Sequence, residues 1–418
     1  MSKKILIVGA LLALTLVALA ACAPAPTPAP TAAPPTAAPA QPTAVPAQPT
    51  TAPVKFGIVL IGPYNDHGWS EAHYIAANYV KSKIPGSDFT YVDSAYDRPN
   101  TTLETIVTDM KSKGIKFILT TSDAFQDDTV ALAPKFPDIT FINVSGDSAW
   151  KDGKNYKPIP NLGNFMGKME YMKMVAGCDA ALSSQTGKIG FLGPLINDET
   201  RRLADSAFLG AKYCWTNYAK KNAADLKFDV TWIGNWFYIP GKTLDPTKVA
   251  NDFYNSGHDV VISGIDTTEA LIVAGQRQKQ GEKVWAISYD FKDGCNEAPD
   301  ACLGVPYFNW GPRYVQELQK FAAGKWTPGW YWDGPDWKDI NNPDTSAVGF
   351  TFGKALTEAN KATLQKFIAG MGDGSINLLK GPITLQDGTA YLAAGATPTD
   401  QQIWYLPQLL QGMTGQSK

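Results

Sequence analysis

Three short patterns resemble catalytic motifs, but each lacks a part that its chemistry requires. The stretch 234–243 ends in Gly-Lys-Thr, as a phosphate-binding loop does, yet its glycines stand further apart than in a P-loop. The stretch 146–150 resembles the turn that carries a hydrolase serine, but no histidine follows His258 and none has the expected neighbours. Asp127 and Asp128 begin a helical pattern, where capping explains paired carboxylates. We therefore predict that the chain is not an enzyme.

A second set of residues consists of aromatic rings and polar side chains that follow predicted strands. Stacking on an aromatic ring contributes about 1–3 kcal/mol per base, and polar contacts to the edge of a ligand add discrimination. A purine offers both features, with two π faces and a rim of N–H donors and ring acceptors. Singly, each tryptophan could be core and each aspartate a helix cap, but as a set they favour a binding site. The candidate residues are Asp66, Trp69, Ser122, Asp123, Phe165, Trp236, Asp266, Asp290 and Trp310.

Predicted strands and helices must hold these residues in place. They appear in the sequence as short apolar runs that alternate with helical patterns from Lys55 onward. Runs such as 55–62 and 117–120 indicate buried strands, and residues 70–83 have helical spacing between them. The alternation restarts after about residue 166, with strands predicted at 188–192 and 259–263. This pattern predicts an α/β fold of two similar lobes, each a parallel sheet with helices on both faces. Ligands of such sheets bind beyond the carboxyl ends of the strands, where the candidate residues fall.

A cluster of tryptophans near residue 330 follows a different pattern. Trp326, Trp330, Trp332 and Trp337 lie among proline, glycine and aspartate residues. This composition predicts an irregular loop or hairpin that packs on the body of the protein. A sugar-stacking surface is the second interpretation.

The N-terminus predicts export and a lipid anchor. Two lysines precede an apolar run, 5–21, that is about as long as a signal-peptide core. The run ends in Leu-Ala-Ala-Cys22, which resembles the bacterial lipobox, whose cysteine is acylated and becomes the mature N-terminus. The competing interpretation is an ordinary cleavage site with a chance cysteine. Residues 23–53 are almost wholly alanine, proline and threonine, a composition that predicts an extended tether.

The remaining four cysteines are expected in an oxidising compartment, where disulfides form. Four cysteines allow three pairings. Cys295 and Cys302 flank one short loop, so we expect them to pair with each other and Cys178 to pair with Cys214. A zinc site is the alternative, but no CxxC spacing occurs and the histidines lie far from these thiols in sequence. We predict neither a metal nor a cofactor.

The composition is that of an ordinary globular protein, with 44% hydrophobic and 18% charged residues. The part after the tether is long enough for two hydrophobic cores. A formal net charge of −2 gives no basic field, so we expect no nucleic-acid partner.

The stretch Phe-Gly-Ile-Val-Leu-Ile-Gly-Pro-Tyr-Asn-Asp-His-Gly-Trp at 56–69 resembles the opening of the basic membrane protein (BMP) family of solute-binding lipoproteins. This family serves ABC transporters for nucleosides, nucleobases and related compounds. The similarity runs from about residue 55 to 414 and includes the segments 120–122, 235–242, 309–312, 367–370, 381–383, 387–388 and 399–400. The resemblance implies a substrate-binding component of an ABC uptake transporter, held outside the cytoplasm by its lipid anchor and working with permease subunits.

The resemblance also implies the type I periplasmic-binding fold, in which the chain crosses between two lobes and a ligand closes the cleft between them. We therefore expect a leader of two parts, a first lobe completed by one return segment and a second lobe completed by another. The expected boundaries are 1–21 for the signal peptide, 22–53 for the anchor cysteine and linker, 54–165 with about 291–345 for the first lobe, and 166–290 with about 346–418 for the second.

One departure from the family bears on the ligand. Nucleoside-binding members place a lysine before the final helix to contact the ribose, whereas residues 305–310 of this chain contain no basic residue. The resemblance therefore favours a bare nucleobase such as adenine over a nucleoside. A sugar- or riboflavin-binding receptor, and a signalling receptor without a permease, remain open as alternatives.

Overall fold

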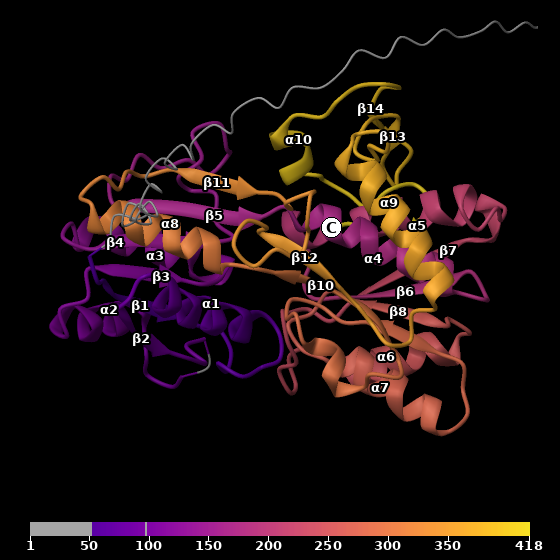
Figure 1. Ribbon diagram of the computed structural model, residues 1–418, viewed down its shortest axis with the longest axis horizontal. Coiled ribbons are helices and arrows are strands. Elements are labelled where there is room, and N and C mark those ends of the chain that lie inside the picture. Colours follow the sequence, from indigo (N-terminus) through magenta and orange to yellow (C-terminus); the bar gives the residue numbers. More distant parts are fainter. Residues whose placement is uncertain (1–51, 97) are drawn as a thin grey trace, which may run out of the picture. The chain divides into compact units, whose positions relative to one another are not determined.

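Two large β-sheets form the framework of the computed structural model, which describes residues 52–96 and 98–418 (Figure 1). The first sheet has the strand order β11-β5-β4-β3-β1-β2, and its strands run parallel. Strand β3, Phe-Ile-Leu-Thr, is buried at every position, as expected where helices cover both faces of a parallel sheet. The strands of this sheet are β1 (Lys55–Val59), β2 (Asp88–Val92), β3 (Phe117–Thr120), β4 (Thr140–Val144), β5 (Leu162–Gly167) and β11 (Trp330–Asp333).

Helices pack in pairs on the first sheet. Helix α1 (Trp69–Lys83) contacts α8 (Gly311–Ala322), which comes from a distant part of the sequence. Helix α2 (Leu103–Ser112) contacts α3 (Gln126–Leu132). A capping box at Thr102 begins α2 and satisfies N–H groups that would otherwise be unpaired at the helix start. These helices complete the first lobe.

The second sheet repeats this plan with one reversal. Its order is β12-β10-β9-β8-β6-β7-β15, and its strands run parallel except β12, which is antiparallel to β10. Strand β10 is not among the strands predicted from the sequence. It contains Gly304 and Pro306, and proline lacks the N–H that a ladder uses. The strands are β6 (Lys188–Gly193), β7 (Lys227–Trp232), β8 (Val260–Ser263), β9 (Trp285–Ile287), β10 (Cys302–Phe308), β12 (Val348–Phe352) and β15 (Met413–Thr414).

Two disulfides lie in the second lobe. One joins Cys178 on α4 to Cys214 on α5, two helices that pack closely along their lengths. The other joins Cys295 to Cys302 and closes the short turn before β10. Helix α4 also contacts β8, β10 and α9, whereas α6 packs against α7. The helices of this lobe are α4 (Met169–Ser183), α5 (Asp198–Asn217), α6 (Pro246–Asn255), α7 (Glu269–Lys279) and α9 (Glu358–Gly372).

Within the described residues the chain passes between the two lobes three times. It leaves the first sheet after β5 at Gly167, returns after β10 at Phe308 and leaves again after β11 at Asp333. The return therefore comes later than the expected residue 291. The reason is that β10 pairs with β9 and β12 and so belongs to the second sheet.

The segment expected to be a loop or hairpin contains a strand of the first sheet instead. Strand β11 carries Trp330 and Trp332 and pairs in parallel with β5. Trp330 stacks on Trp150 with ring centres 4.1 Å apart, and Trp404 meets both Trp330 and Trp332 edge-on. Aromatic packing at the sheet edge therefore outweighs the surrounding turn-forming residues. Because these rings pack on one another, the arrangement does not favour a sugar-stacking surface.

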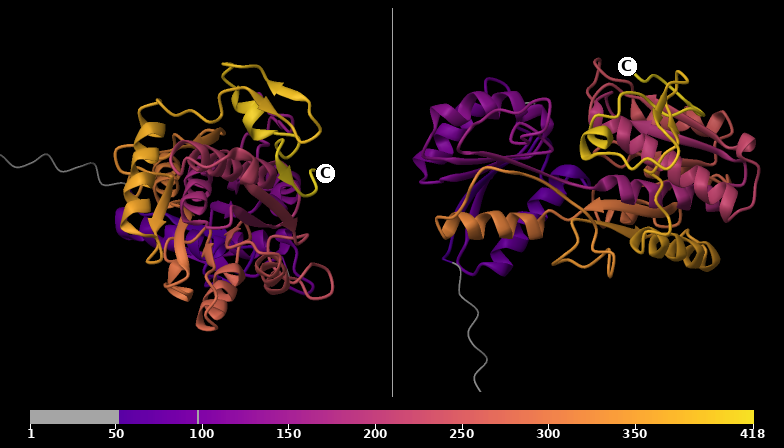
Figure 2. Two further views of the ribbon diagram at one scale, coloured as in Figure 1. Left: turned by 90° about the vertical axis from the view of Figure 1, so that its right-hand side faces the viewer. Right: turned by 90° about the horizontal axis from the view of Figure 1, so that it is seen from above.

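The C-terminal segment, from residue 373 onward, contacts both lobes. In Figure 2 it is drawn in yellow and lies over the second lobe. Tyr405 donates its hydroxyl to Asp147 Oδ2 of the first lobe at 2.6 Å. The N–H of Leu410 donates to Asp205 Oδ1 of the second lobe at 3.1 Å. Besides β15, the elements of this segment are β13 (Ile383–Thr384), β14 (Ala390–Leu392) and α10 (Asp400–Trp404).

The two lobes touch where their strands end. Gly68, just before α1, lies so close to Asp266, just after β8, that a Cβ atom on Gly68 would stand 1.7 Å from the Asp266 main-chain oxygen. Asp123 of the first lobe also accepts hydrogen bonds from Trp236 and Asn197 of the second. The structure therefore has a closed arrangement, in which main chain of one lobe rests on main chain of the other.

Replacing Gly68 by alanine should prevent this closed arrangement, because the added methyl group would overlap main chain that cannot turn aside. We expect Gly68→Ala to increase the radius of gyration in small-angle X-ray scattering while far-UV circular dichroism stays unchanged. Gly334→Ala is a matched control, since its nearest neighbour, Lys168 Cδ, would lie 4.0 Å from the added carbon. An unchanged radius of gyration for Gly68→Ala would contradict the prediction.

Candidate binding cleft

A small cavity lies where the strand ends of the two lobes meet. Its empty volume, which includes space open to solvent, is about 200 Å³. Both lobes contribute, and the lining residues are Trp69, Ser122, Asp123 and Ser145 of the first lobe and Glu199, Trp236 and Asp266 of the second. The structure thus brings together Trp69, Ser122, Asp123, Trp236 and Asp266 of the expected set.

An aromatic layer stands behind Trp69. Trp69 donates its indole N–H to a main-chain oxygen after β3 at 2.6 Å, which fixes the orientation of the ring. Trp310 packs edge-on against Trp69 at 5.3 Å and is stacked between His73, at 4.7 Å, and Phe308, at 4.3 Å. Phe165 contacts Trp310 at 5.9 Å. Phe165 and Trp310, both expected to bind a ligand, therefore support the cavity wall and do not line it, because neighbouring rings cover the faces of Trp310.

Asp123 joins the two lobes across the cavity. Its Oδ1 accepts hydrogen bonds from Ser122 Oγ at 3.2 Å and from Trp236 Nε1 at 3.1 Å, and its Oδ2 accepts from Asn197 Nδ2 at 3.2 Å. The main-chain oxygen of Trp236 accepts the N–H of Asp266 at 3.0 Å, which positions the indole. Burial raises the pKa of Asp123, and these donors oppose the rise. The Asp123 carboxylate is therefore both a wall of the cavity and a contact that closes it.

Asp66, also expected to contact a ligand, caps helix α1. Its Oδ1 accepts the N–H groups of Gly68 and Glu71 at 3.0 and 2.9 Å, and its Oδ2 accepts the N–H of Ser70 at 2.9 Å. A carboxylate at this position satisfies free N–H groups and interacts favourably with the helix dipole. Asp66 does not line the cavity. Its contribution is to orient the turn that carries Gly68 and Trp69.

Asp290 lies beside the cavity in an unusual setting. It is fully buried, and neither of its carboxylate oxygens has a hydrogen-bond partner in the described part of the chain. Its φ of 67° lies in the left-handed region, which costs free energy for any residue other than glycine. The preceding Ser288 and Tyr289 also carry buried, unpartnered hydroxyl groups in this part of the chain. Since buried polar groups are nearly always paired, a strained and unpaired segment at a strand end is typical of a binding site.

Several acidic side chains are buried in the cleft or beside it. Burial raises the pKa of Glu199 to about 8 and raises the pKa of Asp266 and Asp290 well above the usual carboxylate range. Negative charge on Asp290 and Glu199 raises the pKa of Asp266 further. Among the effects that lower the pKa of Asp290, the positive charge of the Lys173 ammonium group is the largest. Clustered perturbed pKa values of this kind are typical of functional sites.

Several residues of this site are not among those predicted from the sequence. Ser145 and Glu199 line the cavity, and Asn197 bonds to Asp123. Asn197 follows the predicted strand 188–192, but it also forms an ordinary capping box at the start of α5. Lys173 had a clearer signal, since it is a lysine within the largely apolar stretch of α4.

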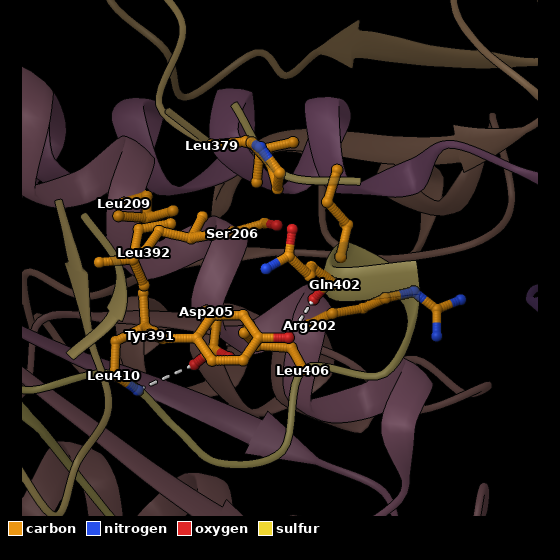
Figure 3. A pocket seen from close by; sticks show the side chains of 13 residues that line it. Arg202, Asp205, Ser206, Leu209, Leu379, Tyr391, Leu392, Gln402, Leu406 and Leu410 are labelled. Atoms are coloured by element: carbon orange, nitrogen blue, oxygen red, sulfur yellow. Dashed lines mark hydrogen bonds between the residues drawn. The ribbon is translucent and has the colours of Figure 1, made fainter. Parts of the chain in front are cut away.

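A larger cavity, with an empty volume of about 340 Å³, lies away from the strand ends between α5 and the C-terminal segment (Figure 3). Its lining is chiefly leucine and isoleucine. Of the two hydrogen bonds drawn as dashed lines, the one from Leu410 N–H to Asp205 joins the C-terminal segment to α5, and the one from the Tyr391 hydroxyl to Gln402 O lies within that segment. This cavity is a gap in the packing beneath that segment, so the cleft is the candidate site.

One histidine does acquire the neighbours of a catalytic triad in the fold. Ser256 Oγ lies 2.9 Å from His258 Nδ1, and His258 Nε2 lies 2.7 Å from Asp229 Oδ2. A serine nucleophile also needs free N–H donors beside it to stabilise an oxyanion. The N–H groups of Ser256 and Gly257 already bond to carbonyls in the last turn of α6. The hydrogen bonds among Ser256, His258 and Asp229 therefore stabilise the C-terminal end of α6.

Comparisons with known proteins agree with this architecture. The Purine-binding protein BAB2_0673 of Brucella abortus is 28% identical over 84% of this chain and 90% of its own length. A protein of Haloferax volcanii named for glucose binding, TsgA13, is 23% identical over 66% of this chain and 63% of its own length. Among solved structures, a solute-binding protein of an ABC transporter system from Aeropyrum pernix K1 shares the fold with a TM-score of 0.61 at 12% identity, over 84% of this chain and 95% of that one.

The sequence model of one family matches residues 54–334, which include the strand ends of both lobes and the residues that line the cleft. This match confirms the resemblance to the BMP family. The two-lobed α/β fold of solute-binding proteins is confirmed by the same sheets and by the solved structure. This chain belongs to the Bmp family of PnrA-like ABC transporter substrate-binding proteins.

Proposed function

We propose that this protein captures a purine nucleobase in the cleft between its lobes and delivers it to an ABC permease. The observation that carries the proposal is a cavity of about 200 Å³ that combines two tryptophans with buried hydrogen-bonding side chains. A purine requires both a surface to stack on and partners for its edge atoms. The name of the Brucella abortus relative supports the same class of ligand.

The polar groups of the cleft suit the edge of a purine. The Asp266 carboxyl can accept hydrogen bonds from ring N–H and amino groups and, when protonated, can also donate one, and the hydroxyls of Ser122 and Ser145 can either donate or accept. Both kinds of purine edge atom can therefore be met. The residues that line the cavity include no lysine or arginine. Because phosphate recognition depends on such cations, this lining disfavours nucleotides.

One observation favours a nucleobase over a nucleoside. Residues 305–310, which form the end of β10 and the approach to α8, contain no basic residue where the family resemblance implies a ribose-binding lysine. We therefore propose adenine or a similar base as the natural ligand.

Calorimetry with adenine, guanine, adenosine, glucose and riboflavin tests this proposal. We expect adenine to bind most tightly and glucose and riboflavin not to bind. Tight binding of glucose without a response to any purine would overturn the proposed ligand class. A clear preference for adenosine over adenine would overturn only the choice of a nucleobase. Mass spectrometry of small molecules that copurify with the protein gives an independent reading.

Trp236 allows stacking to be separated from lobe closure. If its ring stacks on the base, Trp236→Ala should weaken adenine binding by about 1–3 kcal/mol, roughly ten- to a hundredfold. Trp236→Phe keeps an aromatic face and loses the N–H that Asp123 accepts, so it should lose less affinity. Trp285→Ala is the control, because Trp285 begins β9 at the end of the sheet away from the cleft. Equal losses for Trp236→Ala and Trp236→Phe would contradict stacking as the role of Trp236.

We also propose that the protein is held at the membrane by an acylated Cys22. As an ABC substrate-binding protein it acts outside the cytoplasm, and no helix within residues 52–96 and 98–418 has the length and apolarity to cross a membrane. Cys22 itself lies outside the described residues, so the proposal rests on the lipobox-like sequence before it. Intact-mass spectrometry should find lipid on the wild-type protein and none on Cys22→Ser. Wild-type protein without lipid would contradict the proposal.

A further inference from the structure

A lysine is buried in the middle of helix α4. The Lys173 side chain is fully shielded from solvent, and its Nζ donates a hydrogen bond to the main-chain oxygen of Ser263 at 2.7 Å. Nζ also lies 3.2 Å from the centre of the Tyr289 ring and 5.6 Å from the centre of the Phe191 ring. The ammonium group is therefore held by one carbonyl and the faces of aromatic rings.

Such a position is costly for a cation. Removing an ammonium group from water carries a large desolvation penalty, which a single carbonyl and cation–π contacts repay only in part. A methionine or leucine would fill the same space without that penalty. Methionine is already buried on either side of this position in the same helix, at Met172 and Met174. The charge of Lys173 therefore needs an explanation other than the packing of α4.

The contacts of Lys173 connect it to two carboxyl groups of the second lobe, Asp266 in the cavity lining and Asp290 beside it. Ser263 is the last residue of β8, and the loop that follows carries Asp266. Tyr289 directly precedes Asp290, whose carboxylate oxygens have no partner in the described part of the chain. One ammonium group thus touches both segments that present these carboxylates.

We propose that Lys173 is a positioning residue for ligand binding, which keeps the Asp290 carboxylate charged and available as an acceptor for an N–H group of the ligand. The lysine does not line the cavity and acts through the segment that includes Tyr289. This inference rests on the proposed function in one respect, namely that the ligand carries N–H donors.

The electrostatics of the cleft support this role. Burial lowers the pKa of Lys173 to about 7, and the negative charges of Asp290 and Glu199 oppose the decrease. Burial raises the pKa of Asp290, and the positive charge of Lys173 opposes that increase. The two groups therefore stabilise each other's charged forms near neutral pH. Other titratable or charged groups on the elements around them are Asp66, Asp123, Glu170, Arg202, Asp266 and Tyr289.

The expected pH dependence follows from these charges. If binding requires an ionised Asp290, affinity should fall as the pH drops through the pKa of that carboxyl. Removing the positive charge of Lys173 raises the pKa of Asp290 further, so the fall in affinity should begin at a higher pH. Restoring a positive charge with arginine should move the fall back toward its wild-type position.

The test is calorimetry with adenine at a series of pH values from about 5 to about 8.5, on wild type, Lys173→Met and Lys173→Arg. We expect Lys173→Met to bind about tenfold more weakly at neutral pH, with its loss of affinity shifted upward by about one pH unit. For Lys173→Arg, most of this upward shift should disappear. Asp179→Asn is the control, because Asp179 is buried on the same helix and burial raises its pKa to about 8, so the amide replaces a largely neutral group. Its pH profile should match wild type.

A Lys173→Met profile that coincides with wild type would overturn the proposal. So would equal shifts for the methionine and arginine variants, since these would report altered packing instead of lost charge. Asp290→Asn supplies a second arm if Lys173→Met does not fold: without an ionisable group at 290 the acid loss of affinity should disappear, and its persistence would also overturn the proposal. If wild type binds glucose and no purine, the proposed ligand class fails and with it the N–H donor. Because the hydroxyl groups of glucose can also donate to a carboxylate, the same pH series with glucose still tests whether Lys173 keeps Asp290 available as an acceptor.

Discussion

Several carboxyl groups are buried where the two lobes meet, and the surrounding structure has to offset their loss of solvation. A carboxylate taken out of water is stable only if it gains hydrogen bonds, a nearby cation or a proton. Asp66 gains the free N–H groups of α1, and Asp123 gains donors from both lobes, including Asn197. Asp290 has instead the distant charge of Lys173. The cleft is thus incompletely compensated at Asp290, and under the proposed function a ligand with N–H donors would favour the closed lobes by supplying what that carboxylate lacks.

The fold explains how residues so far apart in sequence share this environment. Each lobe is a parallel sheet, and parallel strands deliver the residues that follow them to one edge. Trp69, Ser122, Asp123, Trp236 and Asp266 all come shortly after a strand that a short apolar run predicts. For this reason their meeting in one cavity could be predicted from the sequence, without knowledge of how the lobes are oriented.

Other features of the site could not be predicted, because they depend on packing between distant segments. An aspartate near a helix start has the same sequence context whether it caps the helix, as Asp66 does, or faces a ligand. Trp310 follows a strand as Trp69 does, yet it lies one layer deeper because His73 and Phe308 cover its faces. The residues around β11 favour a loop, yet this segment forms a strand. Pairing with β5 and the stacking of Trp330 on Trp150 stabilise it, and neither contact can be predicted from the local sequence.

The close approach of Gly68 to Asp266 has a kinetic consequence. Side chains rearrange within nanoseconds, but here main chain of one lobe meets main chain of the other, so no change of rotamer opens the cleft. A bound molecule leaves only after whole lobes have moved apart, a motion that takes microseconds to milliseconds. The lifetime of the complex is therefore bounded by the opening rate of the hinge. Contact with a permease that holds the lobes apart would shorten that lifetime without altering any atom that the ligand touches.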